Sequence, residues 1–351
     1  MRVALIQMPV VPDKQRNIQT ALAKIREAAD NGADFAVLPE MFCCPYDNSC
    51  FRPYGEPEGG EAQAALSALA AERKLYLVGG TVPELAGDQV YNTCYVYGPD
   101  GRQLARHRKA HLFDIDVPGG QRFRESDTFS RGNAVTTFET AFGTMGLCVC
   151  FDLRFEELAR CMCLRGAKVI FVPAAFNMTT GPAHWEILFR QRAVDNQCFT
   201  VGVAPARDEA ASYVSYGNSI AVDPWGTVLC RAGAEETTLY ADLDLDRLGG
   251  GGGPAPPPSR ALVGGPRAPS SPAGGRTCTR SASDERPRLS RLLRRGKADP
   301  RRKSRHLRPD RPAGRHAPVR PAGGIRHGRL SGPGRALPPG GGPVRRHQGR
   351  L

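Results

Sequence analysis

Short apolar runs alternate with segments of helical spacing through the first 248 residues. An apolar run closed by glycine, proline or charge predicts a buried strand, and apolar residues three or four positions apart predict an amphipathic helix. The predicted strands are Arg2–Gln7, Phe35–Leu38, Leu75–Val78, Thr144–Val149, Val169–Val172, Phe199–Ala204 and Thr238–Leu243, and the predicted helices are Asn17–Asp30, Ala62–Arg73, Glu156–Arg165 and His184–Asn196.

Two turn signals, at residues 98–101 and 223–226, add a pair of hairpins to this pattern. The strands they connect are Asn92–Tyr97 with Gln103–Arg108, and Ser219–Val222 with Thr227–Cys230. Helices interleaved with strands and hairpins are typical of an α/β layered domain built on mixed sheets.

Composition divides the chain near Leu248. Residues 1–248 contain 24 Lys+Arg and 31 Asp+Glu, whereas residues 249–351 contain 24 Lys+Arg and only 4 Asp+Glu, with 20 Gly, 17 Pro and no aromatic residue. A segment with so little apolar area cannot offset the entropy lost on ordering. We therefore predict one folded domain over residues 1–248 and a disordered Gly/Pro/Arg-rich tail over residues 249–351.

The basic tail first suggests a nucleic-acid partner. It lacks aromatic stacking platforms and any folded nucleic-acid-binding motif, so we do not expect that partner. Its 22 Arg, with Gly, Pro and Ala, form the residue set of GC-rich codons read out of frame. We hypothesise a frameshift near codon 248, which resequencing of the DNA across the junction would test.

Other partners and the compartment are constrained by the apolar runs and the cysteines. No run approaches the roughly 18 apolar residues of a transmembrane helix, so no membrane partner is expected. The apolar part of Met1–Gln7 is too short for a signal peptide. The ten cysteines before Leu248 are therefore expected to be reduced thiols in a cytoplasmic protein.

Three residues with reactive side chains stand at predicted strand ends, where an α/β fold exposes groups to a ligand. Glu40 follows Phe35–Leu38, Lys109 ends a hairpin strand, and Cys150 lies between a strand and a helix. Backbone N–H groups at a helix start can lower the pKa of a thiol and bind an oxyanion.

No histidine of the domain lies in a protease-like signature with Cys150. A carboxylate must then accept the thiol proton, and a lysine must supply positive charge to the tetrahedral intermediate.

Other polar groups are given structural interpretations. Asp152 and Arg154 are expected to pair and hold the turn after Cys150. Cys43, Cys44 and Cys50 lack a second Cys/His pair at zinc spacing, so no metal site is predicted. The glycine pairs at 79–80 and 119–120 are interpreted as turn glycines, since no phosphate-loop motif follows either.

Three motifs together resemble those of the nitrilase superfamily of carbon–nitrogen hydrolases. They are Pro39-Glu40, His107–Phe113 and Cys150–Phe155. The resemblance is closest to the omega-amidase branch, through Leu112–Gly120, Phe123–Asp127, Pro173–Glu186, Arg192–Gln197, Pro205–Asp208 and Pro224–Gly226. It implies a four-layer α-β-β-α sandwich, usually paired as a homodimer, and no metal or organic cofactor.

The resemblance also implies roles for single residues. Glu40 would be the general base, Cys150 the nucleophile, and Lys109 the partner of the oxyanion. Glu125 would be a second active-site carboxylate that positions Lys109, and the backbone N–H of Phe151 would help to bind the oxyanion.

The implied substrate is the short ω-amide of a 2-oxo dicarboxylic acid, 2-oxoglutaramate or 2-oxosuccinamate. The residues implied to line its pocket are Phe176, Asn177, Thr179, Thr180, His184 and Trp185. A deaminated-glutathione amidase is the alternative within the superfamily, because it shares the stretch Thr180–Glu186. The family domain normally continues into a C-terminal arm, and nothing after Leu248 matches that arm.

Overall fold

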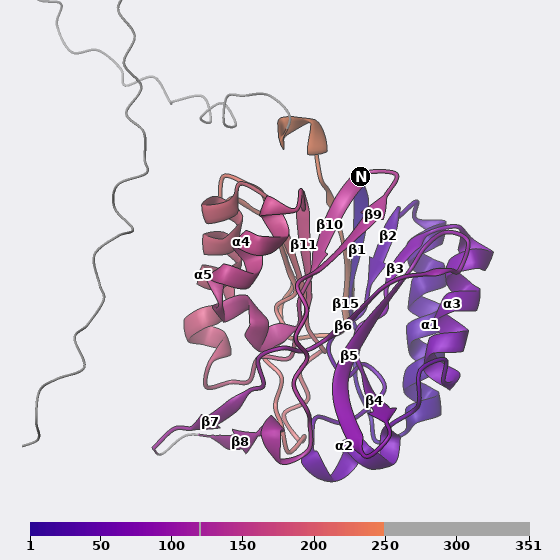
Figure 1. Ribbon diagram of the computed structural model, residues 1–351, viewed down its shortest axis with the longest axis vertical. Helices are drawn as coiled ribbons and strands as arrows, with labels where there is room; N and C mark the ends of the chain where they lie inside the picture. Colours follow the sequence, from indigo (N-terminus) through magenta and orange to yellow (C-terminus); the bar gives the residue numbers. More distant parts are fainter. Residues whose placement is uncertain (119–120, 249–351) are drawn as a thin grey trace, which may run out of the picture. The chain divides into compact units, whose positions relative to one another are not determined.

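Two β-sheets face one another, and a pair of helices covers the outer face of each (Figure 1). The computed structural model describes residues 1–118 and 121–248. The first sheet has the order β15 (Thr237–Asp242), β1 (Arg2–Gln7), β2 (Phe35–Val37), β3 (Tyr76–Val78), β5 (Gln89–Tyr97) and β4 (Val82–Ala86), with β6 (Gln103–Arg108) also paired to β5. The second has the order β14 (Val228–Arg231), β13 (Ile220–Val222), β12 (Phe199–Val203), β11 (Val169–Pro173), β10 (Gly143–Leu147) and β9 (Thr136–Thr140).

The helices give the arrangement its four layers. On the first sheet lie α1 (Lys14–Asp30) and α3 (Glu61–Arg73), and on the second lie α4 (Glu156–Leu164) and α5 (Gly181–Asn196) (Figure 1). The remaining elements are α2 (Asn48–Tyr54), the hairpin β7 (Asp114–Asp116) and β8 (Arg122–Arg124), and 3₁₀ helices over Glu125–Asp127, Cys150–Arg154 and Leu245–Leu248. The predicted α-β-β-α sandwich is thus confirmed.

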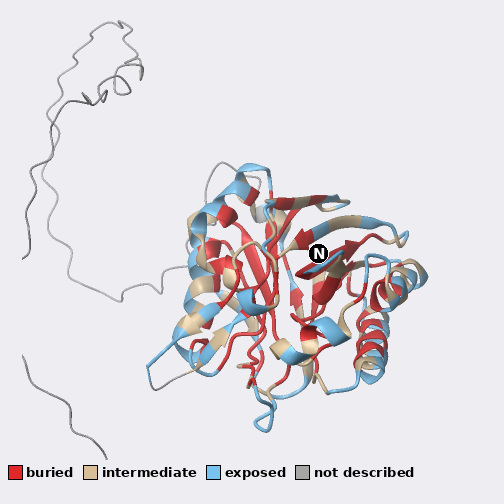
Figure 2. Cartoon of the chain, turned by 60° about the horizontal axis from the view of Figure 1, so that its bottom comes forward, coloured by how far each residue is buried: buried red, intermediate tan, exposed pale blue. Residues whose placement is uncertain are grey.

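The central strands are buried on both faces, which explains their continuous apolar runs. In β1, Val3 and Leu5 pack into the core between the sheets, while Ala4 and Ile6 pack with the helices outside. Figure 2 shows the resulting buried strands at the centre, with exposed residues on the outer helices. The rings of Phe35 in β2 and Phe171 in β11 stack with centroids 5.1 Å apart and tie the two sheets together.

The predicted helices, strands and hairpins all form, with ends shifted by a few residues at most. Sequence reasoning missed α2, β4, β7, β8 and β9. Strand β4 carries Pro83 at the edge of its sheet, β9 has Phe138 as its one buried aromatic, and β7 and β8 span three residues each. Such segments lack the apolar alternation that identifies a strand.

Two predictions lie outside the described residues. They are the disordered tail at 249–351 and the turn assigned to Gly119-Gly120. The domain boundary at Leu248 stays a prediction. No helix in residues 1–118 or 121–248 is long and apolar enough to cross a membrane.

Strand direction places the three predicted site residues together. Strands β1, β2 and β3 are parallel, and β6 runs the same way because it is antiparallel to β5, which is antiparallel to β3. In the second sheet, β10, β11 and β12 are parallel. Glu40, Lys109 and Cys150 therefore each follow the carboxyl end of a strand, where α/β folds gather ligand-binding groups.

Candidate active site

The structure brings Glu40, Lys109 and Cys150 into one buried cluster. The Lys109 Nζ donates to Glu40 Oε1 at 2.9 Å, and the negative charge of Glu40 acts on the Cys150 thiol. Glu40 and Lys109 are fully buried, and Cys150 is 4% exposed. An ion pair in such a site is little screened by water.

The turn after β2 fixes the position of Glu40. Met41 has a φ of +52°, and its N–H donates to Thr81 Oγ1 at 2.8 Å. Gly80, with φ +62°, passes so close that a Cβ there would lie 2.3 Å from the carbonyl oxygen of Pro39. Only glycine fits this approach, so the interpretation as a turn glycine is confirmed for Gly80.

Cys150 occupies a strained turn between a strand and a short helix. Its φ is +48°, a conformation that costs a non-glycine residue free energy, and it is the first residue of the 3₁₀ helix Cys150–Arg154. The first N–H groups of a helix lack partners within it, which leaves the Phe151 N–H suited to bind an anion beside the thiol.

The expectation that the helix start lowers the pKa of Cys150 is wrong. Burial, and then the negative charge of Glu40, raise the pKa of the thiol well above its ordinary value, and Lys109 only partly offsets them. The resting side chain is therefore a neutral thiol, whose proton must be removed as it attacks.

Glu125 holds the other side of Lys109. Its carboxylate accepts from Lys109 Nζ at 2.9 Å, from the Phe113 N–H at 2.6 Å, and from the hydroxyl of Tyr46. Burial acts to lower the pKa of Lys109, but the charges of Glu125 and Glu40 outweigh it and raise that pKa. Burial raises the pKa of Glu125 itself. Lys109 is therefore charged and clamped between two carboxyl groups.

Two polar residues of the cluster, Asn92 and Tyr46, were missed in the sequence. Asn92 Nδ2 donates to Glu40 Oε1 at 2.8 Å, and its backbone oxygen accepts from the Lys109 N–H at 2.8 Å. The sequence signal that could have identified Asn92 is an amide side chain within the largely apolar strand β5. The structure buries this side chain completely. Tyr46 lies in an irregular loop and carries no such signal.

Asp152 links the residues on either side of Lys109 to the turn that carries Cys150. Its carboxylate contacts His107 Nε2 at 3.0 Å and His111 Nδ1 at 2.7 Å, and it accepts from the N–H groups of His111 and Val149. The predicted pairing of Asp152 with Arg154 is therefore wrong. Burial would raise the pKa of Asp152, but the hydrogen bonds from His107 and His111 hold it well below its ordinary range.

Arg154 instead faces the thiol pocket. Its guanidinium lies 5.3 Å from the ring centroids of both Phe151 and Phe176, and Nη2 is 3.1 Å from His184 Nδ1. Its Nε is buried without a hydrogen-bond partner, and no carboxylate within residues 1–118 or 121–248 forms an ion pair with it. A half-buried cation without a counter-charge is suited to bind an anionic ligand.

A narrow pocket opens onto Cys150 beside this guanidinium. Its lining is Phe113, Cys150, Phe151, Arg154, Ala175, Phe176, Thr180 and Tyr213. The pocket combines an aromatic wall and one cation around the thiol, and its volume of about 10 Å³ is that of a single water molecule.

The predicted pocket residues divide into two groups. Phe176 and Thr180 line the pocket, and Asn177 shapes the turn by accepting from the N–H groups of Thr179 and Thr180. Thr179 is exposed. Trp185 is buried and donates from Nε1 to the backbone oxygen of Asn218 at 2.6 Å, so it packs the helix rather than facing Cys150.

The ring of His184 contacts the guanidinium of Arg154. Burial, and then the charge of Arg154, lower the pKa of His184, which keeps its ring neutral beside the guanidinium. Within the residues that the structure describes, no group of three or more His, Cys, Asp or Glu side chains is placed to hold a metal ion.

A family profile and two relatives of known activity match the same part of this chain. The profile of the carbon–nitrogen hydrolase family matches residues 2–250. Omega-amidase NIT2 of Mus musculus is 51% identical over 247 residues, which are 70% of this chain and 90% of that protein. Omega-amidase NIT2 of Homo sapiens is 50% identical over the same length, with the same shares of the two chains.

Solved structures agree with these sequence matches. Nit3 of Saccharomyces cerevisiae, a member of branch 10 of the nitrilase superfamily, is 41% identical with a TM-score of 0.64, covering 69% of this chain and 89% of that one. A variant of the amidase from Nesterenkonia sp. AN1, in which acrylamide has added to the active-site cysteine, is 27% identical with a TM-score of 0.59, covering 69% and 93% of the two chains.

The buried carboxylate of Asp152 predicts a pH-dependent stability. Because its pKa in the folded state is lowered, its ionisation stabilises the fold above about pH 4, and this contribution is lost as the pH falls further. We expect Asp152→Asn to lower the free energy of unfolding near neutral pH by about 3 kcal/mol. Urea denaturation should also show a smaller loss of stability between about pH 5 and pH 3 than in the parent chain.

Asp116→Asn is the matched control, because that side chain is 73% exposed. It should leave both the stability and its pH dependence as in the parent chain. If the free energy of unfolding depended on pH equally in the parent chain and in Asp152→Asn, the lowered pKa assigned to Asp152 would be contradicted.

Proposed function

The chain belongs to the carbon–nitrogen hydrolase family and is an amidase, and from this premise we propose that it hydrolyses the terminal amide of a small 2-oxo dicarboxylic acid monoamide. The products would be the 2-oxo acid and ammonia, and 2-oxoglutaramate and 2-oxosuccinamate are the substrates proposed. The observation that carries this proposal is the unpaired guanidinium of Arg154 beside the thiol of Cys150.

In the first half of the proposed reaction, Cys150 attacks the amide carbon while Glu40 accepts the thiol proton. The raised pKa of the thiol makes this proton transfer necessary, and Glu40 Oε2, which is buried without a hydrogen-bond partner, can accept the proton. Negative charge then develops on the amide oxygen. Lys109 Nζ and the Phe151 N–H stabilise it, and Glu125 keeps Lys109 in place.

In the second half, Glu40 returns the proton to the amide nitrogen, the C–N bond breaks, and ammonia leaves a thioester on Cys150. A water molecule activated by Glu40 then attacks the thioester and regenerates the thiol. Glu40 is therefore base, acid and base again, and it finally returns a proton to the departing thiolate, a sequence that a buried carboxylate bonded to Lys109 and electrostatically coupled to the thiol can perform.

The far end of the substrate supplies the specificity. A carboxylate placed against Arg154 would form a charge-assisted pair in a poorly solvated pocket. A short chain suits the narrow space between Arg154 and Cys150. A deaminated-glutathione amidase remains the alternative, since it shares the stretch Thr180–Glu186.

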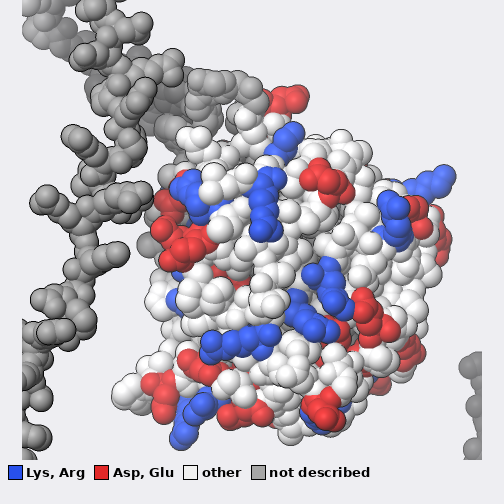
Figure 3. Space-filling model, viewed as in Figure 1, with Lys and Arg blue, Asp and Glu red and all other residues white. Residues whose placement is uncertain are grey.

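The competing non-enzymatic interpretation, nucleic-acid binding through the basic tail, concerns residues outside the described part of the chain. On the face seen in Figure 3, basic and acidic side chains of the domain are interspersed, which does not suit a polyanion. A cytoplasmic location belongs to the proposal, because the ten cysteines of the described residues are all free thiols.

The proposed protein partner is a second copy of the chain. Ile187 and Val194 on the outer face of α5 are 62% and 48% exposed, and Trp225 beside them is 52% exposed. These side chains border a shallow hollow over α5. Large apolar side chains gathered around one hollow are typical of a protein interface.

The nucleophile is tested by an ammonia-release assay on 2-oxoglutaramate, 2-oxosuccinamate and deaminated glutathione. Cys150→Ala should lower activity on the preferred substrate by at least about 10³-fold, because no thioester can form. Cys161→Ala, which removes an exposed thiol, is the control and should retain activity. Unchanged activity in Cys150→Ala would refute the mechanism, and comparable rates on all three substrates would refute only the substrate assignment.

The carboxylate site is tested by Arg154→Gln. Loss of a charge-assisted pair of about 3 kcal/mol should lower kcat/KM for 2-oxoglutaramate about 100-fold. For the neutral diamide, which lacks the distal carboxylate, Arg154→Gln should lower kcat/KM by less than about threefold. The kcat/KM of Arg154→Lys for 2-oxoglutaramate should lie between those of the parent chain and Arg154→Gln. Arg122→Gln, at a side chain that is 73% exposed, is the control and should keep the kcat/KM of the parent chain. An equal loss on the charged and neutral substrates would contradict the assignment.

The partner is tested by Ile187→Glu. A charge in the centre of the apolar face should weaken self-association by at least tenfold, which sedimentation equilibrium measures. Glu139→Gln, on the distant strand β9, should not change it. A parent chain that sediments as a monomer at every concentration would contradict the proposed homodimer.

A further inference from the structure

The carboxylates of Glu40 and Glu125 share one uncharged donor, the side-chain amide of Asn92. Its Nδ2 donates to Glu40 Oε1 at 2.8 Å and to Glu125 Oε1 at 3.4 Å. Cys94 and Val96, the next residues of β5 on the same side, pack in the core between the two sheets. Asn92 is therefore an amide on a strand face that continues as apolar core.

The two carboxylates determine which way the Asn92 amide is turned. The side chain is fully buried, and its Oδ1 has no hydrogen-bond partner. Turned by 180°, the amide would direct that oxygen at Glu40 and Glu125, which would repel it. A buried acceptor without a partner costs free energy, so the donation from Nδ2 to the carboxylates must outweigh that cost.

The same contacts make the two oxygens of the Glu40 carboxylate unequal. Oε1 accepts from Asn92 Nδ2 at 2.8 Å and from Lys109 Nζ at 2.9 Å, and the Tyr46 hydroxyl lies 3.2 Å from it. Oε2 is buried and has no hydrogen-bond partner. A proton taken up by Glu40 would consequently be held on Oε2, because Oε1 already faces three donors.

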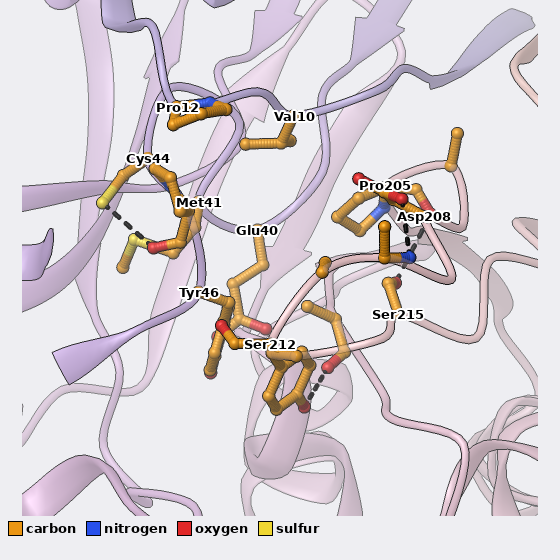
Figure 4. Close-up of a pocket in the computed structure, with 16 residues that line it drawn as sticks. Val10, Pro12, Glu40, Met41, Cys44, Tyr46, Pro205, Asp208, Ser212 and Ser215 are labelled. Carbon is orange, nitrogen blue, oxygen red and sulfur yellow. Dashed lines mark hydrogen bonds between the residues drawn. The ribbon is translucent and has the colours of Figure 1, made fainter. Parts of the chain in front are cut away.

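Asn92 contacts Glu40 without reaching the space that is open to a substrate. Glu40 and Tyr46 line a cavity of about 320 Å³, shown in Figure 4, and Cys150 lines the narrow pocket described above. Among the residues that the structure describes, neither lining includes Asn92. An effect of its side chain on the reaction would therefore be exerted through the carboxylates that it contacts.

We propose that Asn92 is a positioning residue that fixes the rotation of the Glu40 carboxylate, so that Oε2 takes up the thiol proton and returns it. This inference rests on the proposed function, in which Glu40 is the general base. As the S–C bond forms, the proton of Cys150 passes to Oε2, and it moves from the same oxygen to the amide nitrogen as the C–N bond breaks. Without the Asn92 amide the carboxylate is free to rotate, and the proton is no longer held at one atom.

The first test is Asn92→Leu, which keeps the size of the side chain and removes its donor. It should lower kcat for 2-oxoglutaramate about 30-fold and leave KM within about threefold, because Asn92 does not touch the substrate. Thr93→Val is the matched control, since it removes a hydroxyl that donates at 2.7 Å to the buried carboxylate of Glu84 from the same strand. It should leave both constants within about threefold of those of the parent chain.

A second measurement separates positioning from a merely structural role and needs no substrate. The rate at which iodoacetamide alkylates Cys150, followed by mass spectrometry of the peptide that carries it, reports removal of the thiol proton. Glu40→Gln should lower this rate at least about 100-fold, and Asn92→Leu about 30-fold. The double variant should be no slower than Glu40→Gln, because Asn92 acts only through Glu40. Asn92→Ser, whose shorter side chain lacks the amide donor, should lose as much as Asn92→Leu.

Losses that multiply in the double variant would overturn the positioning role and leave the proposed function standing. Alkylation rates of Asn92→Leu and Asn92→Ser within about threefold of the parent rate would do the same. Unchanged alkylation and ammonia release in Glu40→Gln would instead overturn the proposed role of Glu40 as base.

Discussion

The ammonium group of Lys109, buried between Glu40 and Glu125, is the interaction on which the site depends. Two carboxyl groups this close, away from water, would repel each other, and the cation between them offsets that repulsion. The same contacts join the ends of β2 and β6 to the 3₁₀ helix at Glu125. Removing Lys109 would leave the two buried carboxyl groups without a counter-charge, so the site depends on this one cation.

This unit exists because the two sheets are held face to face. Glu40 and Lys109 come from the first sheet, whereas Cys150 comes from the second, so their contacts require the packing that Phe35 and Phe171 provide. Asp152 adds a polar link across the same boundary, from the turn after β10 to the segment after β6. The core and the hydrogen-bond network thereby fix one geometry, as a preorganised site requires.

Strand ends could be predicted from the sequence because apolar runs end abruptly, and this placed Glu40, Lys109 and Cys150 correctly. Glu125 was found only through a family motif. The partners of Asp152 and the raised pKa of the thiol could not be predicted, since both depend on groups that only the folded chain brings near. Arg154 was assigned to the wrong partner because a charge pair close in sequence looked sufficient, whereas the structure turns the two side chains apart.

The electrostatics of the site are local and differ from the charge of the chain. The sequence carries a formal net charge of +13, yet residues 1–248 contain 24 Lys+Arg against 31 Asp+Glu. One guanidinium without a carboxylate partner lines the pocket at Cys150, whereas Glu40 and Asp208 line a separate cavity that shares Ala175 and Tyr213 with it. A substrate with a carboxylate at one end and an amide at the other would be oriented by this difference before it reacts. In the proposed mechanism the thiol stays protonated until Glu40 accepts its proton, so that orientation would precede nucleophilic attack.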